Sequence, residues 1–283
     1  MSFYHLNHRA IISVSGDEPL AFLHDILTAN LAARSAGEMT QSCLLSPQGR
    51  ILIEMLVLVA DKKDVFIACD DAQKDELVKK LKLYRLRRKI AIELVDDAIL
   101  VASDEVPSQK TLVTCADNRC TDRGYVSVIA KSGASDISFS DNDAYHAKRI
   151  ADGIPEGAVD LTPNRALILE AGLDLFEAVD FQKGCYIGQE VTARTKYRGL
   201  VKRRLVPVKA AKLETGAPVS QNDKEVGVIL SVAQIGDEMV GLASLKLQAI
   251  HDYEAGAILQ AQECALSLHI PAHLMPIPAP NKS

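Results

Sequence analysis

Short apolar runs bounded by turn residues recur along residues 1–130, and each run predicts a β-strand. Two of the runs are separated by the Pro-Gln-Gly-Arg turn at 47–50, which predicts a hairpin. The predicted strands are residues 10–14, 43–45, 51–60, 65–69, 90–95, 99–103, 112–115 and 125–130.

Helical periodicity interrupts these strands. After Asp17, a candidate N-cap, leucines recur at steps of three and four residues and predict one apolar helix face: Leu20, Leu23, Leu27 and Leu31. A second helix is predicted after Asp70 and Asp71, and a third begins at Asp143 and stops at Gly153. Strands around a helix, followed by more strands, favour an α+β sandwich of ferredoxin-like kind.

The pattern changes after residue 204, where short β runs alternate with turn signals. The runs are 205–208, 225–232, 239–245 and 258–268, and a small antiparallel barrel is the simplest way to close them. The last residues, 271–283, contain four prolines and predict a loose tail.

The stretch with the most chemistry is 183–190, Lys-Gly-Cys-Tyr-Ile-Gly-Gln-Glu. Gly184 allows backbone angles closed to other residues, and Gly188 leaves room for another strand or a ligand to come close. Lys183 would favour the thiolate of Cys185 if both side chains face one pocket. The residues alone leave two interpretations open: a reactive loop, or a strand-to-helix turn with a half-buried thiol.

These eight residues resemble the K-G-C-aromatic-x-G-Q-D/E signature of the YgfZ family. That family comprises folate-binding proteins related to the mitochondrial factor that helps mature 4Fe–4S enzymes, and to the T-protein (aminomethyltransferase) of the glycine cleavage system. Further segments resemble the family in the same order along the chain: 22–28, 45–51, 153–157, 169–173, 226–231 and 241–243.

The resemblance implies an α+β fold: a three-lobed T-protein-like ring with a ferredoxin-like inserted domain, a small C-terminal β-barrel and folate in the central hole. We expect four parts. They are a discontinuous first domain of 1–41 and 140–200 that carries the signature loop, a ferredoxin-like α+β domain at 42–139, an antiparallel β-barrel at 201–270, and the tail 271–283.

Residues 165–172 resemble the R-x-x-L-R-L-E-A-G segment of T-protein, whose glutamate holds the pterin ring. A carboxylate accepts two N–H donors of an aminopyrimidine edge at once, which suits Glu170, although Ile168 replaces the family arginine. The alternative interpretation is that Glu170 is a surface carboxylate that binds no ligand. The residues that the resemblance assigns to folate are Glu170, Arg165, Tyr186, Gln189 and Asn30. Those it assigns to the signature loop are Cys185 and Lys183 as the catalytic pair, with Gly184, Gly188 and Glu190.

The resemblance implies an accessory protein that binds tetrahydrofolate and supports assembly or repair of iron–sulfur enzymes. Its partners would be folate and the assembly machinery or client enzymes. A folate-dependent aminomethyltransferase or demethylase is the alternative, so whether the chain is an enzyme stays open. Two departures from T-protein weaken the aminomethyltransferase alternative. Glu54 is a single acid where T-proteins carry two, and Cys185-Tyr186 replaces their acid–aromatic pair. A transfer-RNA modification factor is a third, weaker alternative, because a related folate-binding fold occurs in such a factor. The GTPase P-loop motif is missing from this sequence, which counts against direct equivalence.

Charge adds one feature to this picture. The formal net charge of −5 argues against a general nucleic-acid binder. Between Lys183 and Arg204, however, seven basic residues face one acid, Glu190, and 7 − 1 gives +6. We expect this segment to hold the glutamate tail of a polyglutamylated folate or a partner's acidic surface. A second basic run, 79–89, is interpreted as a solvated helix face rather than an RNA site, because no aromatic residues interleave with it.

The cysteines argue against a metal site, and no metal ligands are expected. None of the six forms a C-x-x-C pair: Cys43, Cys69, Cys115, Cys120, Cys185 and Cys264. Free thiols are the default in a reducing compartment. No apolar run approaches about 20 residues, and the first residues lack the order of a signal or transit peptide, so the sequence predicts a cytoplasmic protein without a membrane partner.

Overall fold

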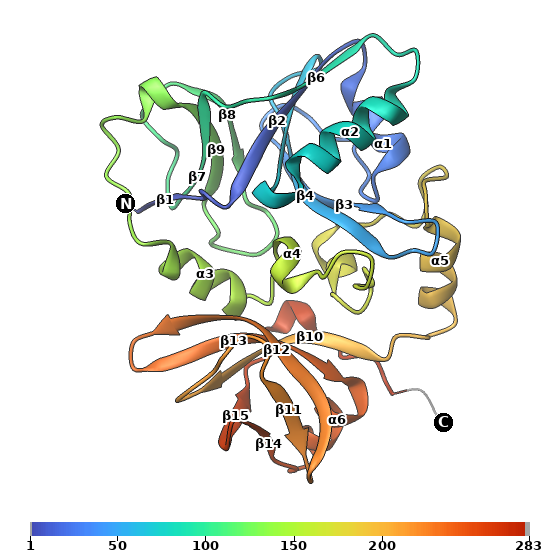
Figure 1. The fold of residues 1–283 in the computed structure, drawn as a ribbon, viewed down its shortest axis with the longest axis vertical. Helices are drawn as coiled ribbons and strands as arrows, with labels where there is room; N and C mark the ends of the chain where they lie inside the picture. Colours follow the sequence, from blue (N-terminus) through green and yellow to red (C-terminus); the bar gives the residue numbers. More distant parts are fainter. Residues whose placement is uncertain (1, 281–283) are drawn as a thin grey trace. The chain divides into compact units, whose positions relative to one another are not determined.

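The structure is a computed structural model, and it describes residues 2–280. The chain folds into two compact units (Figure 1). The first unit comprises Met1–Asn142 and Phe176–Gln189, and the second comprises Asp143–Leu175 and Glu190–Ser283.

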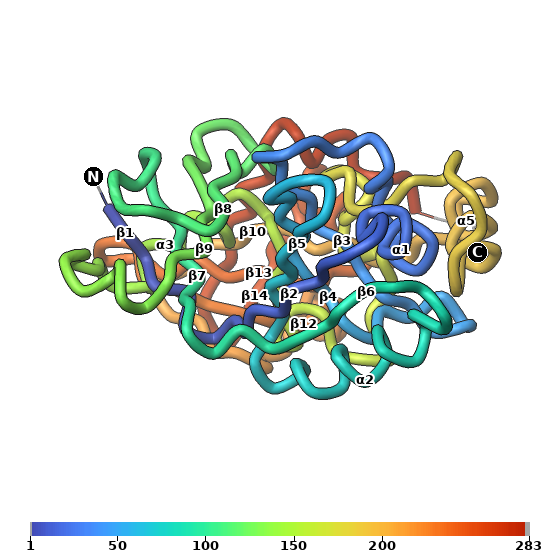
Figure 2. The backbone as a smooth tube through the Cα atoms, turned by 90° about the horizontal axis from the view of Figure 1, so that it is seen from above, coloured from blue at the N-terminus to red at the C-terminus, as the bar shows by residue number. Residues whose placement is uncertain are grey.

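Two antiparallel sheets build the first unit. The larger sheet has the order β3 (Met39–Leu45), β4 (Ile51–Val59), β5 (Asp64–Asp70), β2 (Arg9–Gly16) and β6 (Ile90–Leu94). Strand β2 lies between the central strand β5 and the edge strand β6 and continues the chain from β1 (Figure 2). The smaller sheet has the order β1 (Phe3–His5), β7 (Ala98–Ser103), β9 (Tyr125–Ala130) and β8 (Thr111–Ala116).

Helices α1 (Pro19–Ile26) and α2 (Lys74–Arg85) cover the larger sheet and share one core with it, in which Phe22 and Leu77 are buried. The predicted helix from Asp17 to Leu31 is shorter at both ends than its leucine repeat suggested. It begins after Glu18, whose left-handed φ of 55° starts the first turn at Pro19, and it ends where Leu27 becomes extended. Leu27 and Leu31 are nevertheless fully buried, because the chain after α1 packs into the same core.

A closed six-stranded barrel dominates the second unit and confirms the predicted C-terminal barrel. Its order is β10 (Arg203–Ala210), β13 (Glu238–Lys246), β12 (Lys224–Ile235), β11 (Pro218–Gln221), β14 (Leu259–Ala261) and β15 (Cys264–Leu268), and β15 pairs back with β10. Along β10, Leu205 and Val206 are both buried. The mixed helix and sheet content confirms the α+β class.

The remaining helices are short and connect these sheets. They are α3 (Asn142–Ala151), α4 (Gly157–Asp160), α5 (Gln189–Tyr197) and α6 (Leu247–Glu254), with 3-10 turns η1 (Asp71–Gln73), η2 (Lys131–Gly133), η3 (Leu173–Phe176) and η4 (Ala272–Leu274).

The segment after residue 270 is packed where the sequence predicted a loose tail. Leu274 and Ile277 are 3% and 6% exposed, and a His251 ring nitrogen lies 3.0 Å from the Pro278 carbonyl oxygen. Burial of Leu274 and Ile277 and the contact between His251 and Pro278 therefore hold residues 274–278 against the rest of the protein. Residues 281–283 of the predicted tail lie outside the described part of the chain.

Candidate functional site

Residues 183–189 of the signature loop belong to the first unit, and Gly188 packs against a neighbouring turn. Gly188 has a φ of +83°, and a Cβ built on it would lie 2.6 Å from the Ser46 carbonyl oxygen and 3.1 Å from Gly49 Cα. The 46–49 turn therefore packs directly against this glycine, as its sequence position predicted. Gly184 is different: no heavy atom lies within 4 Å of its Cβ position, and its φ is outside the left-handed range. Gly184 therefore does not adopt the left-handed backbone angles that glycine allows.

Lys183 is directed toward the end of helix α1. Its ammonium donates to the carbonyl oxygens of Leu27 at 2.6 Å and Ala29 at 2.9 Å, and also to that of His24. Carbonyls at a helix C-terminus lack intrahelical partners, so the ammonium satisfies them. Burial lowers the pKa of Lys183 to about 8, against the opposing effect of Asp180. Activation of the Cys185 thiol by Lys183 stays a prediction.

Asn30 and Asp180 form hydrogen bonds that fix the backbone at the start of the signature loop. The Asn30 amide donates to Asp180 Oδ2 at 2.8 Å, while Asp180 Oδ1 accepts from the backbone N–H groups of Gln182 at 2.6 Å and Lys183 at 3.2 Å. Burial alone raises the pKa of Asp180, but these hydrogen bonds and the Lys183 charge lower it overall. The sequence pattern missed Asp180, although an aspartate two residues before two turn N–H groups is a recognisable Asx-turn signal.

Tyr186 is the buried side chain of the loop. It is 7% exposed, the Lys183 ammonium lies 5.0 Å from its ring centroid, and its hydroxyl has no hydrogen-bond partner among residues 2–280. Burial raises the pKa of Tyr186. Gln189 donates to the Lys183 carbonyl oxygen at 3.2 Å and so closes the loop. Cys185, in contrast, is exposed.

A cavity of about 400 Å³ lies in the second unit. Segment 160–171 forms one wall, and strands β10, β12 and β13 form the other. Its walls are largely apolar, and its charged lining residues are Asp160, Arg165, Glu170, Arg203 and Glu225. The structure therefore brings Arg165 and Glu170 together in one cavity, while Asn30, Tyr186 and Gln189 lie in the first unit.

Glu170 is half-buried in this wall, and its carboxylate accepts only one long contact, 3.4 Å, from the Lys202 N–H among the hydrogen bonds of the described chain. Its backbone carbonyl accepts from the Leu205 N–H at 3.1 Å, which ties the segment to β10. The backbone is thus fixed while the carboxylate keeps acceptor capacity toward the cavity.

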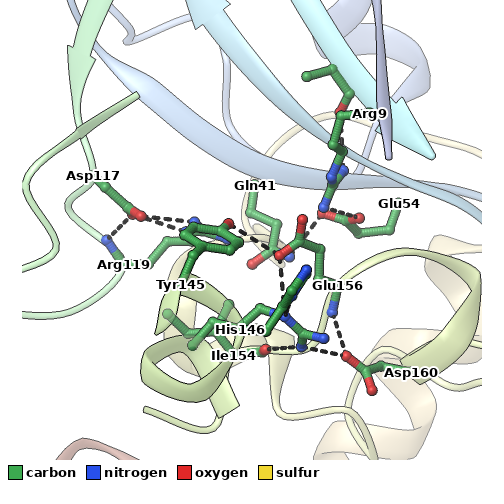
Figure 3. Close-up of polar contacts among 12 residues, drawn as sticks. Arg9, Gln41, Glu54, Asp117, Arg119, Tyr145, His146, Ile154, Glu156 and Asp160 are labelled. Carbon is green, nitrogen blue, oxygen red and sulfur yellow. Dashed lines mark hydrogen bonds and ion pairs between the residues drawn. The ribbon is translucent and has the colours of Figure 1, made fainter. Parts of the chain in front are cut away.

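Asp160 is a cavity residue that the sequence pattern missed. It is 4% exposed, and its Oδ2 accepts from Arg149 Nη1 at 2.6 Å and from the Glu156 N–H at 2.9 Å (Figure 3). Its Oδ1 has no hydrogen-bond partner in the described residues. Helix α4, which carries Asp160, is four residues long, too short for periodicity to reveal it.

Glu54, the single acid compared with the T-protein pair, is engaged in a buried ion pair. Its Oε2 lies 2.9 Å from Arg9 Nη2, and its Oε1 accepts from Gln41 at 2.8 Å (Figure 3). The Arg9 and Glu54 side chains are 0% and 1% exposed. Both carboxylate oxygens of Glu54 are therefore engaged by side chains inside the core.

Cysteines and acids do not converge on a metal site in the described chain. No group of three or more His, Cys, Asp or Glu side chains within residues 2–280 is arranged to hold a metal ion. Three of the six thiols are buried: Cys43, Cys69 and Cys115. Burial raises the pKa of Cys69 and of Cys115 to about 12.

Similarity to known proteins defines the class of this fold. Over 99% of this chain and 88% of the other, the structure superimposes on aminomethyltransferase T of the glycine cleavage system from Bartonella henselae, with a TM-score of 0.75 and 15% identity. Residues 202–276 match the family model described as the CAF17 C-terminal beta-barrel domain. The protein thus has the T-protein fold, as the resemblance implied.

Its sequence relatives are more specific. The chain is 31% identical over 228 residues to an iron–sulfur cluster assembly factor IBA57 homolog of Neurospora crassa, covering 71% of this chain and 52% of that protein. It is 29% identical to mouse IBA57 (94% and 80% covered) and 31% identical to human IBA57 (73% and 65% covered). The chain is therefore a homologue of the IBA57 assembly factors, a YgfZ-type family, and the resemblance seen in the sequence is confirmed.

The predicted cytoplasmic location is wrong, because each of these three relatives is designated mitochondrial. That prediction rested on the composition of the first residues and on the lack of a long apolar run, and neither property decides the compartment. Within residues 2–280, no helix is long and apolar enough to cross a membrane.

Proposed function

We propose that this protein binds tetrahydrofolate or a derivative and supports the assembly or repair of iron–sulfur enzymes. The observation that carries the folate part is the 400 Å³ cavity in which Glu170 and Arg165 share apolar walls. Its volume falls in the range of about 300–1,000 Å³ that is typical of small-molecule sites.

The cavity offers the groups that a reduced folate requires. An aminopyrimidine edge presents N–H donors, and the Glu170 carboxylate with Asp160 Oδ1 supplies acceptors. The carboxylates of a glutamate tail suit guanidinium groups, which Arg165 and Arg203 supply. Apolar side chains such as Leu167 and Leu230 suit the faces of the ring.

Replacing Glu170 by glutamine tests this assignment. The variant keeps the shape but turns one acceptor into a donor, so it should weaken tetrahydrofolate binding about 10- to 100-fold, the loss of one charged hydrogen bond. Anaerobic titration calorimetry measures the affinity. Glu238→Gln is the matched control, because Glu238 is an exposed carboxylate of the same unit outside the cavity lining. An unchanged affinity in Glu170→Gln would remove Glu170 from the site.

The iron–sulfur part is supported by the names of the relatives and by the exposure of Cys185. An exposed thiol on a loop held by Gly188 and Asp180 is accessible to a bound partner or to folate. We expect Cys185→Ser to lower iron–sulfur enzyme activity in cells that lack the gene, while the melting temperature stays unchanged.

Cys264→Ser is the control for this experiment, because Cys264 is a partly exposed thiol of the barrel. Full rescue by Cys185→Ser would show that the thiol is not required for this function. A folate-dependent aminomethyltransferase is disfavoured because Glu54 is held by Arg9 in the core. Steady formation of methylene-tetrahydrofolate from an aminomethylated lipoyl carrier would restore that alternative.

A further inference from the structure

A second cavity, of about 450 Å³, lies in the second unit. Three cations line it: Lys196 and Arg198 from the end of helix α5 and the turn after it, and Arg204 from strand β10. Among the described residues 2–280, the single acid of its lining is Asp174, and the other lining residues are apolar or small: Leu169, Gly199, Val201, Pro278, Ala279 and Pro280.

Strand alternation separates this cavity from the first one. Successive side chains of a strand point to opposite faces, and Arg203 lines the first cavity while Arg204 lines the second. The basic segment identified in the sequence is thus divided by the fold. Lys183 binds α1 carbonyls and Arg194 pairs with Glu190 at 2.7 Å, whereas Lys196, Arg198 and Arg204 gather around this cavity.

Arg204 is the buried cation of the cavity. It is 5% exposed, its Nη1 donates to the Leu169 carbonyl oxygen, and the same nitrogen lies 3.4 Å from Asp174 Oδ1. Its Nε has no hydrogen-bond partner within residues 2–280. A buried guanidinium N–H without an acceptor is costly, and an oxyanion ligand would supply that acceptor.

We propose that this cavity binds a small organic molecule that carries oxyanion groups, either a phosphate ester or a chain of carboxylates. Three cations against one acid give the lining a charge of 3 − 1 = +2. The apolar wall of Leu169, Val201 and Pro278 receives the uncharged part of the ligand. This site is separate from the proposed folate cavity and does not depend on it.

Titration calorimetry of the full chain with two probes, tripolyphosphate and tri-γ-glutamate, tests the proposal and distinguishes the two sources. Arg198→Glu is the main variant, because Arg198 is exposed and its replacement does not disturb the core. We expect the probe that binds the wild type to bind Arg198→Glu about 10- to 100-fold more weakly, as charge-assisted contacts are lost. Lys224→Glu, an exposed lysine at the start of β12, is the control for net charge and should bind like the wild type.

Arg204→Lys provides a second arm, since it keeps the charge but removes the guanidinium geometry. Its far-UV circular dichroism should match the wild type, and its affinity should fall about tenfold or more. If its dichroism shows unfolding, Arg198→Glu decides alone. Binding of neither probe, or an equal loss in Arg198→Glu and Lys224→Glu, would overturn the proposal.

Discussion

Replacing Glu54 by glutamine should lower the free energy of unfolding by about 3–5 kcal/mol, the cost typical of breaking a buried ion pair from one side. Glu54 and Arg9 are both out of contact with solvent, and their charged atoms are 2.9 Å apart. Glutamine keeps the side-chain shape but removes the negative charge that Glu54 places beside the buried Arg9 guanidinium. Gln41, which donates to Glu54 at 2.8 Å, would face an amide instead of a carboxylate.

Urea unfolding followed by far-UV circular dichroism measures this loss, because the chain has no tryptophan to report by fluorescence. For a chain of this size, the melting temperature should fall by about 2–4 °C for each kcal/mol. Glu93→Gln is the matched control, since Glu93 is an exposed carboxylate of the same sheet on β6.

A loss below about 1 kcal/mol in Glu54→Gln, the size of an ordinary surface change, would refute the structural role of the pair. The double variant Arg9→Met with Glu54→Leu gives an independent check. Replacing both charges by apolar groups should recover most of the loss, because neither charge is then left buried alone.

Two further predictions concern a glycine and a pH dependence. Gly188→Ala should destabilise the chain by about 2 kcal/mol or more in a melting curve, because a Cβ would lie 2.6 Å from the Ser46 oxygen at a left-handed φ. Gly184→Ala should change stability by less than about 0.5 kcal/mol, and equal losses in the two variants would contradict the geometry. Burial alone raises the pKa of Asp117, but Arg119 and then Arg123 lower it to about 2. Since this pKa lies below the usual 3.8, the Asp117 contribution is present above pH 3.8 and is lost as pH falls through 2. The wild type should therefore lose about 2 kcal/mol of unfolding free energy between pH 4 and 2 that Asp117→Asn does not lose. If stability falls with pH in the same way in both proteins, the lowered pKa of Asp117 is contradicted.

Local patterns in the sequence determined the repertoire of elements. Apolar runs and turn residues predicted most strands of both sheets and the barrel, because a strand is recognised by side-chain properties that repeat along a few residues. The short strands β1 and β11 were missed, and the hairpin of β14 and β15 was predicted as one run. Gly188 belongs with these features: its spacing in the motif predicted a close approach, and the 46–49 turn makes that approach. The order of the motifs along the chain is enough to indicate the family.

Only the tertiary structure decided what the charged residues contact. The Lys183 ammonium donates to carbonyl oxygens of residues more than 150 positions earlier, contacts that no local pattern in the sequence indicated. Asp160, on a helix of one turn, became a cavity residue because Arg149 and the Glu156 N–H orient its carboxylate. Arg203 and Arg204 are adjacent in one basic run but line two cavities, because β10 points successive side chains to opposite faces. The number of charges along a segment does not say where each side chain points. Side-chain orientation is set by strand pairing and by hydrogen bonds between residues far apart in sequence.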